Sequence, residues 1–470
     1  MKKIKNIHFV GIKGVGMTPL AIIAKEAGFA VTGCDTQDSF ITDEPLKKAG
    51  INPLVGFDKS HVVNADLVIT TGANGGFDNP ENLEAKNLDI PILTQGEAIA
   101  KFQSGEFFGK KYEGISIAGT HGKTTTTAMI AVVLKANKLD PSFAVGTGMI
   151  PFLDSDGHFG KGKYFVAEAD EYATEPKYDK TPKMLLQKPN IGVITNIEYD
   201  HPDVYASLED LKRAFLKFAE GISKDGVLIT NIDNENVREL LRFYKGNVIT
   251  YGFSKTAEFV LTRVNIEQDK TFFWIERNDV SLGEFSINVS GEHNALNALA
   301  AIISCTELGL PIEQIKKGLL SFKGTKRRME YIKTTYQGAL VFDDYAHHPT
   351  EIRKTLETLR KTYPSKKIVC IFQPHTYSRT KSLFEQFKSS FTDVTELILT
   401  KIYSSKRETP DPLVSSEILA QQISTTKNGV IYTENLEDVV KYVVSKAYGR
   451  EYIIITMGAG DVYKILEEIN

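Results

Sequence analysis

The chain has 470 residues, of which 42% are hydrophobic and 24% charged, an ordinary composition for a globular protein with substantial cores. At roughly 150 residues per domain, this length predicts about three domains. The net charge is only -3 at pH 7 and the basic residues are dispersed, which argues against a nucleic-acid or membrane-surface binder. We therefore expect no nucleic-acid partner.

The three cysteines, Cys34, Cys305 and Cys370, lie far apart and lack the Cys/His spacing of a zinc site or a disulfide framework. This pattern favours a reducing compartment. The first apolar stretch runs directly into glycines, which predicts a strand and not a signal peptide. No segment approaches the roughly 18 apolar residues of a membrane-spanning helix. We expect a cytoplasmic location without membrane insertion, and the oligomeric state stays open.

Strand-like apolar runs alternate with helical patterns along most of the chain, which predicts parallel α/β layers. The glycine-rich polar segment 102–114 indicates a first boundary. A second polar segment, 322–328, follows a stretch of β character and an apolar helix. These features predict an α/β fold with three domains: a Rossmann-like domain over 1–108, a central domain over 109–325 and a Rossmann-like domain over 326–470.

A glycine loop with the sequence AGTHGKTT follows a predicted strand directly and leads into a helix with apolar positions at Met129, Ile130, Val133 and Leu134. A strand, a glycine turn and a helix N-terminus direct backbone N–H groups and the helix dipole at one point, as phosphate binding requires. Its lysine can reach the β- and γ-phosphates, and a threonine hydroxyl can bind Mg²⁺. Its glycines enclose two residues where the general pattern has four, so the context is decisive. We predict an ATP-binding loop that comprises Gly119, Thr120, His121, Gly122, Lys123, Thr124 and Thr125.

Mg²⁺ held by Thr124 alone would need further ligands. The predicted strand 163–170 leads into the sequence EADE, and the strand 191–197 leads to Asp200 and His201. An acidic cluster alone is more often a solvated turn, and a lone histidine is usually structural. The carboxyl ends of neighbouring parallel strands share one crevice, however, which favours a magnesium site beside the loop. Among the acids, Glu168 still lies on its strand.

Six segments occur in the order found in Mur ligases: AGTHGKTTTT, EADE, TNIEYDH, SGEHNALNALAA, FKGTKRRMEY and DDYAHHPTEI. By these motifs the chain resembles that family over essentially its whole length. The resemblance implies a UDP-sugar domain, a central P-loop ATPase domain and a C-terminal domain that receives the incoming amino acid. It also implies Lys123 on the phosphates, Thr124 and Glu168 on one Mg²⁺, and His201 on a second.

The same resemblance places further residues at the nucleotide. Asn294 and Asn297 resemble the adenine-side asparagines of the family's HNxxN helix. Arg328 and Asp344 match a C-terminal pair that closes onto the nucleotide phosphates. Arg328 taken alone is equally well explained as an ion pair at the rim of its domain.

His348 and Arg379 resemble the residues that meet the amino acid and the sugar-linked carboxylate. Together with Lys123 they form the catalytic set that the resemblance implies. From the residues alone, His348 is equally well explained as a helix cap before Pro349.

A second glycine loop, GIKGVG, follows the first predicted strand, and an aspartate ends the second strand. Glycines at a helix N-terminus suit any diphosphate, including UDP. A dehydrogenase is an alternative, but Lys13 stands where the dinucleotide fingerprint requires its second glycine. A nucleotide-driven switch is another alternative, although the guanine-reading NKxD of a GTPase is absent. We expect UDP-sugar binding by Gly11, Gly14, Gly16 and Asp35.

Within the family, GIKGVGM and the segments 372–384 and 457–465 favour joining L-alanine to UDP-N-acetylmuramate through an acyl-phosphate, in peptidoglycan biosynthesis. EADEY and IEYDHPDVY favour a sibling that reattaches a recycled tripeptide, L-Ala-γ-D-Glu-diaminopimelate. Gln95, TTGANGGFDNPE and Thr376 depart from the common pattern at substrate positions. Because the C-terminal domain selects the amino acid, we expect L-alanine, with ATP and Mg²⁺ as cofactors.

Overall fold

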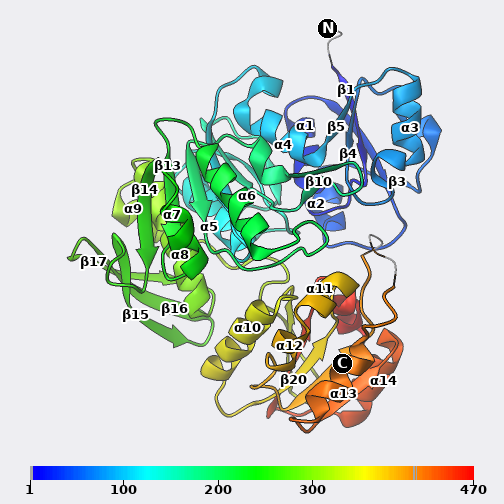
Figure 1. Ribbon diagram of the computed structural model, residues 1–470, viewed down its shortest axis with the longest axis vertical. Coiled ribbons are helices and arrows are strands. Elements are labelled where there is room, and N and C mark those ends of the chain that lie inside the picture. Colours follow the sequence, from blue (N-terminus) through cyan, green and yellow to red (C-terminus); the bar gives the residue numbers. More distant parts are fainter. Residues whose placement is uncertain (1–3, 406–407, 409, 470) are drawn as a thin grey trace.

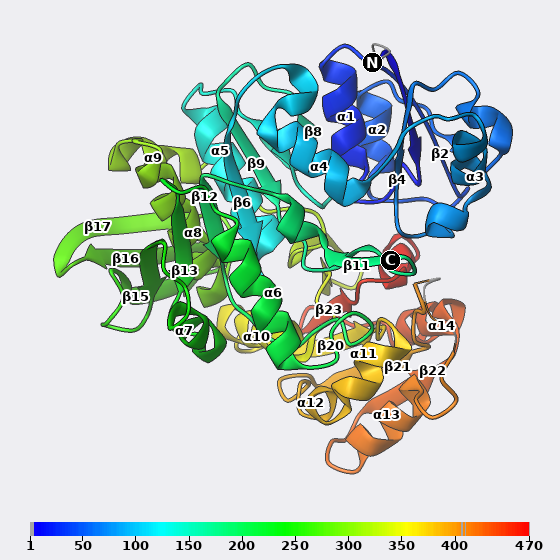
Figure 2. The same ribbon diagram turned by 45° about the horizontal axis from the view of Figure 1, so that its top comes forward.

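The computed structural model describes residues 4–405, 408 and 410–469, and sheet-and-helix layers succeed one another along the chain. The N-terminal layer lies at the top of Figure 1, the central layer at the left and the C-terminal layer below. Figure 2 shows the same arrangement after a turn of 45°. The predicted α/β fold with three domains is confirmed. Its predicted boundaries, after residues 108 and 325, both lie between sheets and remain predictions.

The N-terminal sheet is parallel, in the order β3-β2-β1-β4-β5. Side chains alternate across it, so Ile7 and Phe9 pack with α1 and α4 while Val10 packs with α3. The short β3 was not predicted. The bounds are β1 Asn6–Val10, α1 Thr18–Glu26, β2 Ala30–Asp35, α2 Asp43–Lys48, β3 Leu54–Val55, η1 Lys59–Val62, β4 Leu67–Thr70, α3 Pro80–Asn87, β5 Ile92–Thr94 and α4 Gln95–Ser104.

The central sheet has the order β17-β16-β15-β14-β13-β12-β6-β9-β7-β8. The segment expected to have β character forms β14 to β17. Of these, β15 to β17 pair antiparallel and depart from the parallel layers we expected. The strands are β6 Glu113–Ala118, β7 Ser142–Ala144, β8 Gly157–His158, β9 Tyr164–Glu168, β12 Ile191–Ile194, β13 Val227–Asn231, β14 Asn247–Gly252, β15 Phe259–Glu267, β16 Lys270–Arg277 and β17 Val280–Ile287.

The helix that follows the predicted ATP loop, α5, is buried over most of its length. The four apolar positions predicted for α5 are fully buried, and α5 packs against α8 and α9. A separate hairpin, β10 (Ala173–Glu175) with β11 (Asp179–Pro182), reaches toward the N-terminal domain. The helices are α5 Lys123–Ala136, α6 Leu208–Glu220, α7 Glu235–Leu241, α8 Glu292–Glu307 and α9 Ile312–Leu319.

The C-terminal sheet has the order β18-β19-β23-β20-β21-β22 and is parallel except for β18. In the part of the chain that the structure describes, no helix is long and apolar enough to cross a bilayer. The bounds are β18 Glu330–Thr334, β19 Leu340–Asp344, α10 Pro349–Thr362, β20 Lys367–Phe372, α11 Tyr377–Ser382, α12 Phe384–Lys388, β21 Glu396–Thr400, α13 Ser416–Ser424, β22 Val430–Thr433, α14 Leu436–Lys446 and β23 Tyr452–Met457.

Candidate active site between the central and C-terminal domains

The predicted ATP loop turns between β6 and α5 and is packed too tightly for side chains at its glycines. Gly119 has φ 131° and Gly122 has φ 84°, a region that favours glycine. A Cβ at Gly119 would overlap the hydroxyl of Thr195, and one at Gly122 would overlap the amide oxygen of Asn297. The loop is therefore held between the end of β12 and the start of α8, at the carboxyl edge of the sheet.

The lysine of this loop is held over the loop by a buried carboxylate. Lys123 Nζ lies 2.9 and 2.8 Å from the two carboxylate oxygens of Glu171 and donates to Gly119 O at 2.5 Å. Burial opposes its charged form, but Glu171 and Asp170 outweigh burial and raise the pKa of Lys123. The ammonium group is therefore charged and positioned where a phosphate at the α5 N-terminus would meet it.

Oxygen donors suited to Mg²⁺ adjoin the same lysine. Thr124 Oγ1 donates to Glu168 Oε2 at 3.1 Å, and Glu168 Oε1 accepts from Gly146 N at 2.6 Å. Burial raises the pKa of Glu168, as expected for a carboxylate without a cation in contact. A hydroxyl and a carboxylate beside a phosphate position are the ligand types that Mg²⁺ takes, so these residues fit the ion.

His201, the predicted ligand of a second Mg²⁺, lies farther from the carboxylates. Its Nε2 is 3.6 Å from Glu171 Oε1 and 3.7 Å from Asp200 Oδ2, beyond direct hydrogen-bond distance. The ring packs against that of Tyr172 with a centroid separation of 4.9 Å. His201 therefore lies at the edge of the acidic cluster, beyond hydrogen-bond distance of its carboxylates.

The C-terminal domain contacts the ATP loop through the N-terminus of α10. His121 Nδ1 lies 3.2 Å from Glu351 Oε1, and His121 Nε2 lies 3.4 Å from Glu198 Oε2. Thr350 Oγ1 donates to Glu198 Oε2 at 2.6 Å. The His348 ring centroid is 4.7 Å from that of His121. One carboxylate from each domain therefore flanks the loop histidine.

The two histidines of this junction have opposite protonation preferences. Burial opposes charge on His121, but Glu351 and Glu198 outweigh it and raise its pKa to about 9. Burial, together with the neighbouring His121, lowers the pKa of His348 to about 4. At neutral pH the loop therefore carries a second cation, and His348 is neutral. Its Nδ1 accepts from Thr350 N at 3.2 Å and so caps α10, while its Nε2–H faces Tyr199 O at 3.3 Å.

A second contact joins the two domains through a buried ion pair. Arg379 Nε and Nη2 donate to Asp200 Oδ1 and Oδ2 at 2.7 and 3.2 Å, and both side chains are about 95% buried. Arg379 Nη1 also lies 3.0 Å from His375 Nδ1. Asp200, the partner of Arg379, directly precedes His201 in the chain. This bidentate pair therefore fixes α11, which contains Arg379, against the central domain.

Comparison with known proteins decides the family. Residues 6–106 match the Mur ligase family catalytic domain, 117–305 the Mur ligase middle domain and 327–460 the Mur ligase glutamate ligase domain. The UDP-N-acetylmuramate–L-alanine ligase of Clostridium acetobutylicum is 41% identical over 466 residues, 98% of this chain and 97% of that protein. The chain belongs to the Mur ligase family. Mur ligases depend on ATP, in agreement with the predicted loop.

Two solved structures cover nearly the whole of this Mur ligase. UDP-N-acetylmuramate-alanine ligase from Thermotoga maritima matches with a TM-score of 0.81 and 28% identity, over 99% of this chain and 98% of that one. A murein peptide ligase from Psychrobacter arcticus matches with a TM-score of 0.71 and 24% identity, over 99% and 98%. The second likeness shows the shared fold alone.

The other residues expected to bind the nucleotide in this Mur ligase do not all lie equally near the ATP loop. Asn297 abuts Gly122, and its Nδ2 lies 3.3 Å from Asn294 Oδ1, so both asparagines stand beside the loop. Arg328 Nη1 lies 3.6 Å from Glu351 Oε1, at the junction. Asp344 accepts backbone N–H groups of Met329 and Ala346 at 2.7 Å, and burial raises its pKa to about 6.

The predicted UDP-sugar loop lies in the N-terminal domain. Asp35 Oδ2 accepts from Lys13 N at 2.8 Å, so the aspartate at the end of β2 holds the loop that contains Gly11, Gly14 and Gly16. Gly11 has φ 76°, and a Cβ there would press against the methyl group of Thr71 at 2.5 Å. The loop and the aspartate thus lie in contact, and their binding of the UDP-sugar remains a prediction.

Two residues that depart from the family's common pattern, Gln95 and Thr376, make specific hydrogen bonds in the structure. Gln95 Nε2 donates to Gly16 O at 3.3 Å, which ties the start of α4 to the sugar loop. Thr376 has φ 66° and its N–H donates to Tyr403 O at 2.8 Å, directly before α11. Gln95 therefore lies at the UDP-sugar loop and Thr376 three residues from Arg379.

Sequence reasoning did not assign roles to several acids of this site. Glu171 was passed over because Glu168 ended the strand, yet Glu171 pairs with the loop lysine. Glu198 lies within TNIEYDH, and Glu351 follows His348 by three residues, the spacing of a helix capping box. That spacing was a usable signal for α10, but nothing in the sequence could show that the capping acid also meets the loop of another domain.

Proposed function

We propose that this Mur ligase joins L-alanine to the carboxylate of UDP-N-acetylmuramate, with ATP hydrolysed to ADP and phosphate, in peptidoglycan biosynthesis. Its similarity to a ligase named for these substrates, at 41% identity over nearly the full length, supports the substrate pair. The observation that carries the chemistry is the shared junction. There Lys123 of the central domain pairs with Glu171, while Arg379 and His348 of the C-terminal domain face Asp200 and Glu198 of the central domain.

The first step transfers the γ-phosphoryl group to the sugar-linked carboxylate. A carboxylate oxygen attacks the γ-phosphorus, the bond to the β-phosphate oxygen breaks, and ADP leaves. We assign Lys123 and the α5 N-terminus to the phosphates, because a fixed ammonium stabilises charge on the transferring group. Mg²⁺ bound by Thr124 and Glu168 would neutralise phosphate charge. Asn294, Asn297, Arg328 and Asp344 complete the proposed nucleotide site.

The second step forms the amide. The amino-acid nitrogen attacks the acyl carbon, phosphate leaves, and the nitrogen loses a proton. We assign His348 to the amino acid, because its Nε2–H, which faces Tyr199 O at 3.3 Å, would donate instead to the amino-acid carboxylate. We assign Arg379 to the sugar-linked carboxylate, which would replace Asp200 as its partner. Water must be excluded while the acyl-phosphate exists, and the contacts around His121 supply a closed junction.

We assign UDP binding to the loop of Gly11, Gly14 and Gly16 and to Asp35, which orients that loop. We keep the domain limits 1–108, 109–325 and 326–470 as part of this proposal. A second Mg²⁺ would use His201, which needs a small movement to reach the carboxylates. The three cysteines are buried and unpaired, which favours a cytoplasmic location.

The test is phosphate release by the purified full chain with ATP, Mg²⁺ and fixed UDP-N-acetylmuramate. L-Alanine, L-serine, glycine and the tripeptide L-Ala-γ-D-Glu-diaminopimelate are compared by kcat/KM. We expect L-alanine to exceed the others, because a pocket built for one methyl group excludes a tripeptide by clash. Better use of the tripeptide would instead identify the recycling ligase. The Lys123→Ala variant serves as a background control for contaminating ATPases.

A further inference from the structure

One face of the N-terminal sheet contains a buried polar cluster that the ligase reaction does not use. Residues on β1 and β2 alternate between faces, and the face covered by α3 and η1 has only a small apolar cluster. Within that layer His8, Cys34 and Glu81 are each fully buried. Buried polar groups are costly unless they are fully paired, so three together call for a specific explanation.

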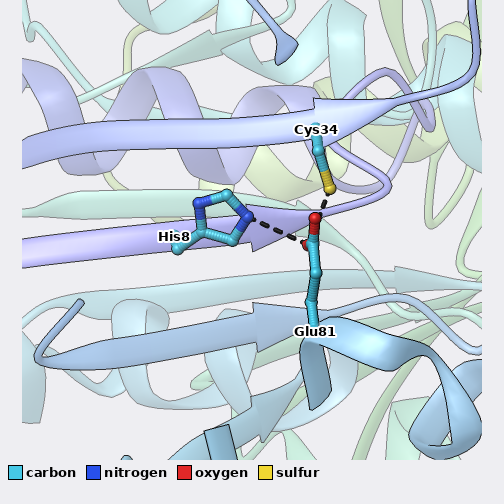
Figure 3. A group of neighbouring side chains, drawn as sticks. All are labelled: His8, Cys34 and Glu81. Carbon is cyan, nitrogen blue, oxygen red and sulfur yellow. Dashed lines mark hydrogen bonds and ion pairs between the residues drawn. The ribbon is translucent and has the colours of Figure 1, made fainter. Parts of the chain in front are cut away.

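The three side chains converge from three different elements. His8 comes from β1, Cys34 from β2 and Glu81 from the first turn of α3, and they point toward one another (Figure 3). Glu81 Oε2 lies 3.1 Å from His8 Nε2 and 2.8 Å from Cys34 Sγ. One ligand atom from each residue lies within 4.8 Å of the others. The atoms therefore surround a single point.

A second histidine closes the cluster on its outer side. His61, in η1, lies with its Nδ1 2.6 Å from Glu81 Oε1, and its side chain is 17% exposed. The His8 and His61 ring centroids are 6.2 Å apart. The backbone N–H of Asp58 donates to the same Glu81 oxygen at 3.1 Å. His61 and the Asp58 N–H thus hold Glu81 Oε1, which leaves Oε2 facing His8 and Cys34.

The orientation of His8 is that of a metal-binding histidine. Its Nδ1 lies 2.9 Å from Thr32 Oγ1, one β-strand away, which directs Nε2 into the cluster. Metal-bound histidines commonly have such a partner on the other ring nitrogen, because it fixes the tautomer and the ring. Thr32 is therefore a positioning residue and does not itself face the other donors.

We propose that His8, Cys34 and Glu81 form a binding site for a divalent cation of the zinc class. An imidazole, a thiolate and a carboxylate are ligand types that Zn²⁺ accepts. The thiolate disfavours Mg²⁺ and Ca²⁺, which require oxygen ligands. One thiolate and one carboxylate cancel a charge of +2, so the buried site is neutral when the cation is bound.

The distances permit this geometry with a small expansion. Tetrahedral ligands at about 2.0–2.3 Å from Zn²⁺ lie roughly 3.3–3.8 Å from one another. Glu81 Oε2 now lies 2.8 Å from Cys34 Sγ and 3.1 Å from His8 Nε2, so these atoms would separate by about 1 Å or less. The Cys34 thiol donates to Glu81 and therefore carries its proton before the cation binds. Cation binding releases that proton to solvent.

The proposed cation would join three elements that are distant in sequence. It would link β1, β2 and α3, of which β1 leads directly into the UDP-sugar loop. Its role is structural, and it lies apart from the Lys123 site in the central domain. The inference is independent of the proposed ligase function, since no substrate or catalytic residue enters it.

The experiment uses the full chain after treatment with EDTA, titrated with Co²⁺ as a spectroscopic substitute for Zn²⁺. Excess Mg²⁺ is present to occupy oxygen-ligand sites. We expect one equivalent of Co²⁺ to produce a thiolate-to-cobalt charge-transfer band, which Zn²⁺ then abolishes. Cys34→Ser should remove the band while its hydroxyl still donates to Glu81, so the fold is retained. Cys305→Ser, at another buried unpaired cysteine, is the matched control and should leave the band unchanged.

Two further variants test the residues that position the donors. His61→Asn should lower the Zn²⁺ affinity measured by competition with a chelating dye, because the His61 ring holds Glu81. Thr32→Val should lower that affinity about 10–100-fold, as expected for a partner of a metal-bound histidine. Absence of a thiolate band in the wild-type protein would overturn the proposal. So would a band that survives in Cys34→Ser, because the thiolate would then come from another cysteine.

Discussion

Two strand–loop–helix units of this Mur ligase share a backbone plan and differ in charge. In the N-terminal domain, β1 leads through Gly11, Gly14 and Gly16 into α1. In the central domain, β6 leads through Gly119 and Gly122 into α5. Each loop contains glycine with positive φ, at Gly11 in the first and at Gly119 and Gly122 in the second. Each lies before a helix N-terminus, where we propose that a phosphate group binds.

The difference lies in what surrounds each loop. Asp35 accepts a backbone N–H of the N-terminal loop, and Lys13 makes a partly exposed ion pair with Asp43 at 3.3 Å. The central loop instead holds a buried ion pair, Lys123 with Glu171, and a histidine contacted by another domain. If the proposed roles hold, one backbone plan serves both to bind a diphosphate and to transfer a phosphoryl group. The buried charges of the central loop are what would make the second use possible.

The largest expected effect distinguishes the two lysines. Lys123→Ala should lower kcat by about 10²–10³, because it removes a positioned cation from the transition state. Lys13→Ala should change kcat less than tenfold and act mainly on KM for UDP-N-acetylmuramate. Both are measured by phosphate release at saturating ATP. Near-normal turnover in a folded Lys123→Ala protein would contradict the assignment of the loop.

A control is needed because Lys123→Ala also leaves Glu171 buried without a cation. The double variant Lys123→Ala/Glu171→Gln removes that unpaired carboxylate and should recover stability. Its kcat should stay low, since the cation is still missing. Thermal unfolding and phosphate release measured on the same samples separate the two effects.

The fold was accessible to sequence reasoning because its pattern is local. Apolar strands followed by helical stretches predicted the three layers, and glycines before a helix predicted both loops. The antiparallel strands β15 to β17 were anticipated only as β character, because pairing direction depends on contacts between residues far apart in sequence. The two-residue β3 was too short to give a pattern.

The site was predictable where its residues lie next to a motif, as Lys123 and Thr124 do. It was not predictable where contacts cross domains. His121 was expected to bind ATP, but its raised pKa comes from Glu198 and Glu351, which lie far from it in sequence. The cluster of His8 and Cys34 was missed for the same reason, since its spacing matches no compact motif.

The second prediction concerns the contact between the central and C-terminal domains, which has no counterpart at the N-terminal loop. Arg379→Gln leaves the Asp200 carboxylate buried without its partner, which typically costs about 3–5 kcal/mol. We expect the C-terminal domain to separate from the central domain. Small-angle X-ray scattering should detect this as an increased radius of gyration. The double variant Asp200→Asn/Arg379→Gln should restore closure through neutral hydrogen bonds. It should not restore kcat/KM if Arg379 binds the sugar-linked carboxylate. An unchanged radius in the single variant would contradict the role of the ion pair in closure.

The third prediction tests the metal ligands of the central loop. Glu168→Gln should raise the Mg²⁺ concentration for half-maximal rate by about tenfold or more, because it removes a charged oxygen ligand. His201→Asn should raise it less, since His201 is 3.6 Å from the nearest carboxylate. Titration of the rate with Mg²⁺ gives both midpoints. Identical midpoints in wild type and both variants would make the two residues structural.

The smallest expected effect is the pH dependence of the junction, and it follows from His121. Its pKa rises from an ordinary 6.5 to about 9 in the folded protein, so folding favours the protonated ring. The stabilisation is therefore fully present below pH 6.5 and is lost as the pH rises through about 9. The melting temperature of the wild type should thus fall toward that of His121→Asn between pH 6.5 and 9.5. His293→Asn is the matched control, because burial lowers the pKa of His293 to about 4 and the ring stays neutral throughout. If the melting temperatures of wild type and His121→Asn run parallel over this range, the loop histidine is not the cation that holds the two domains together.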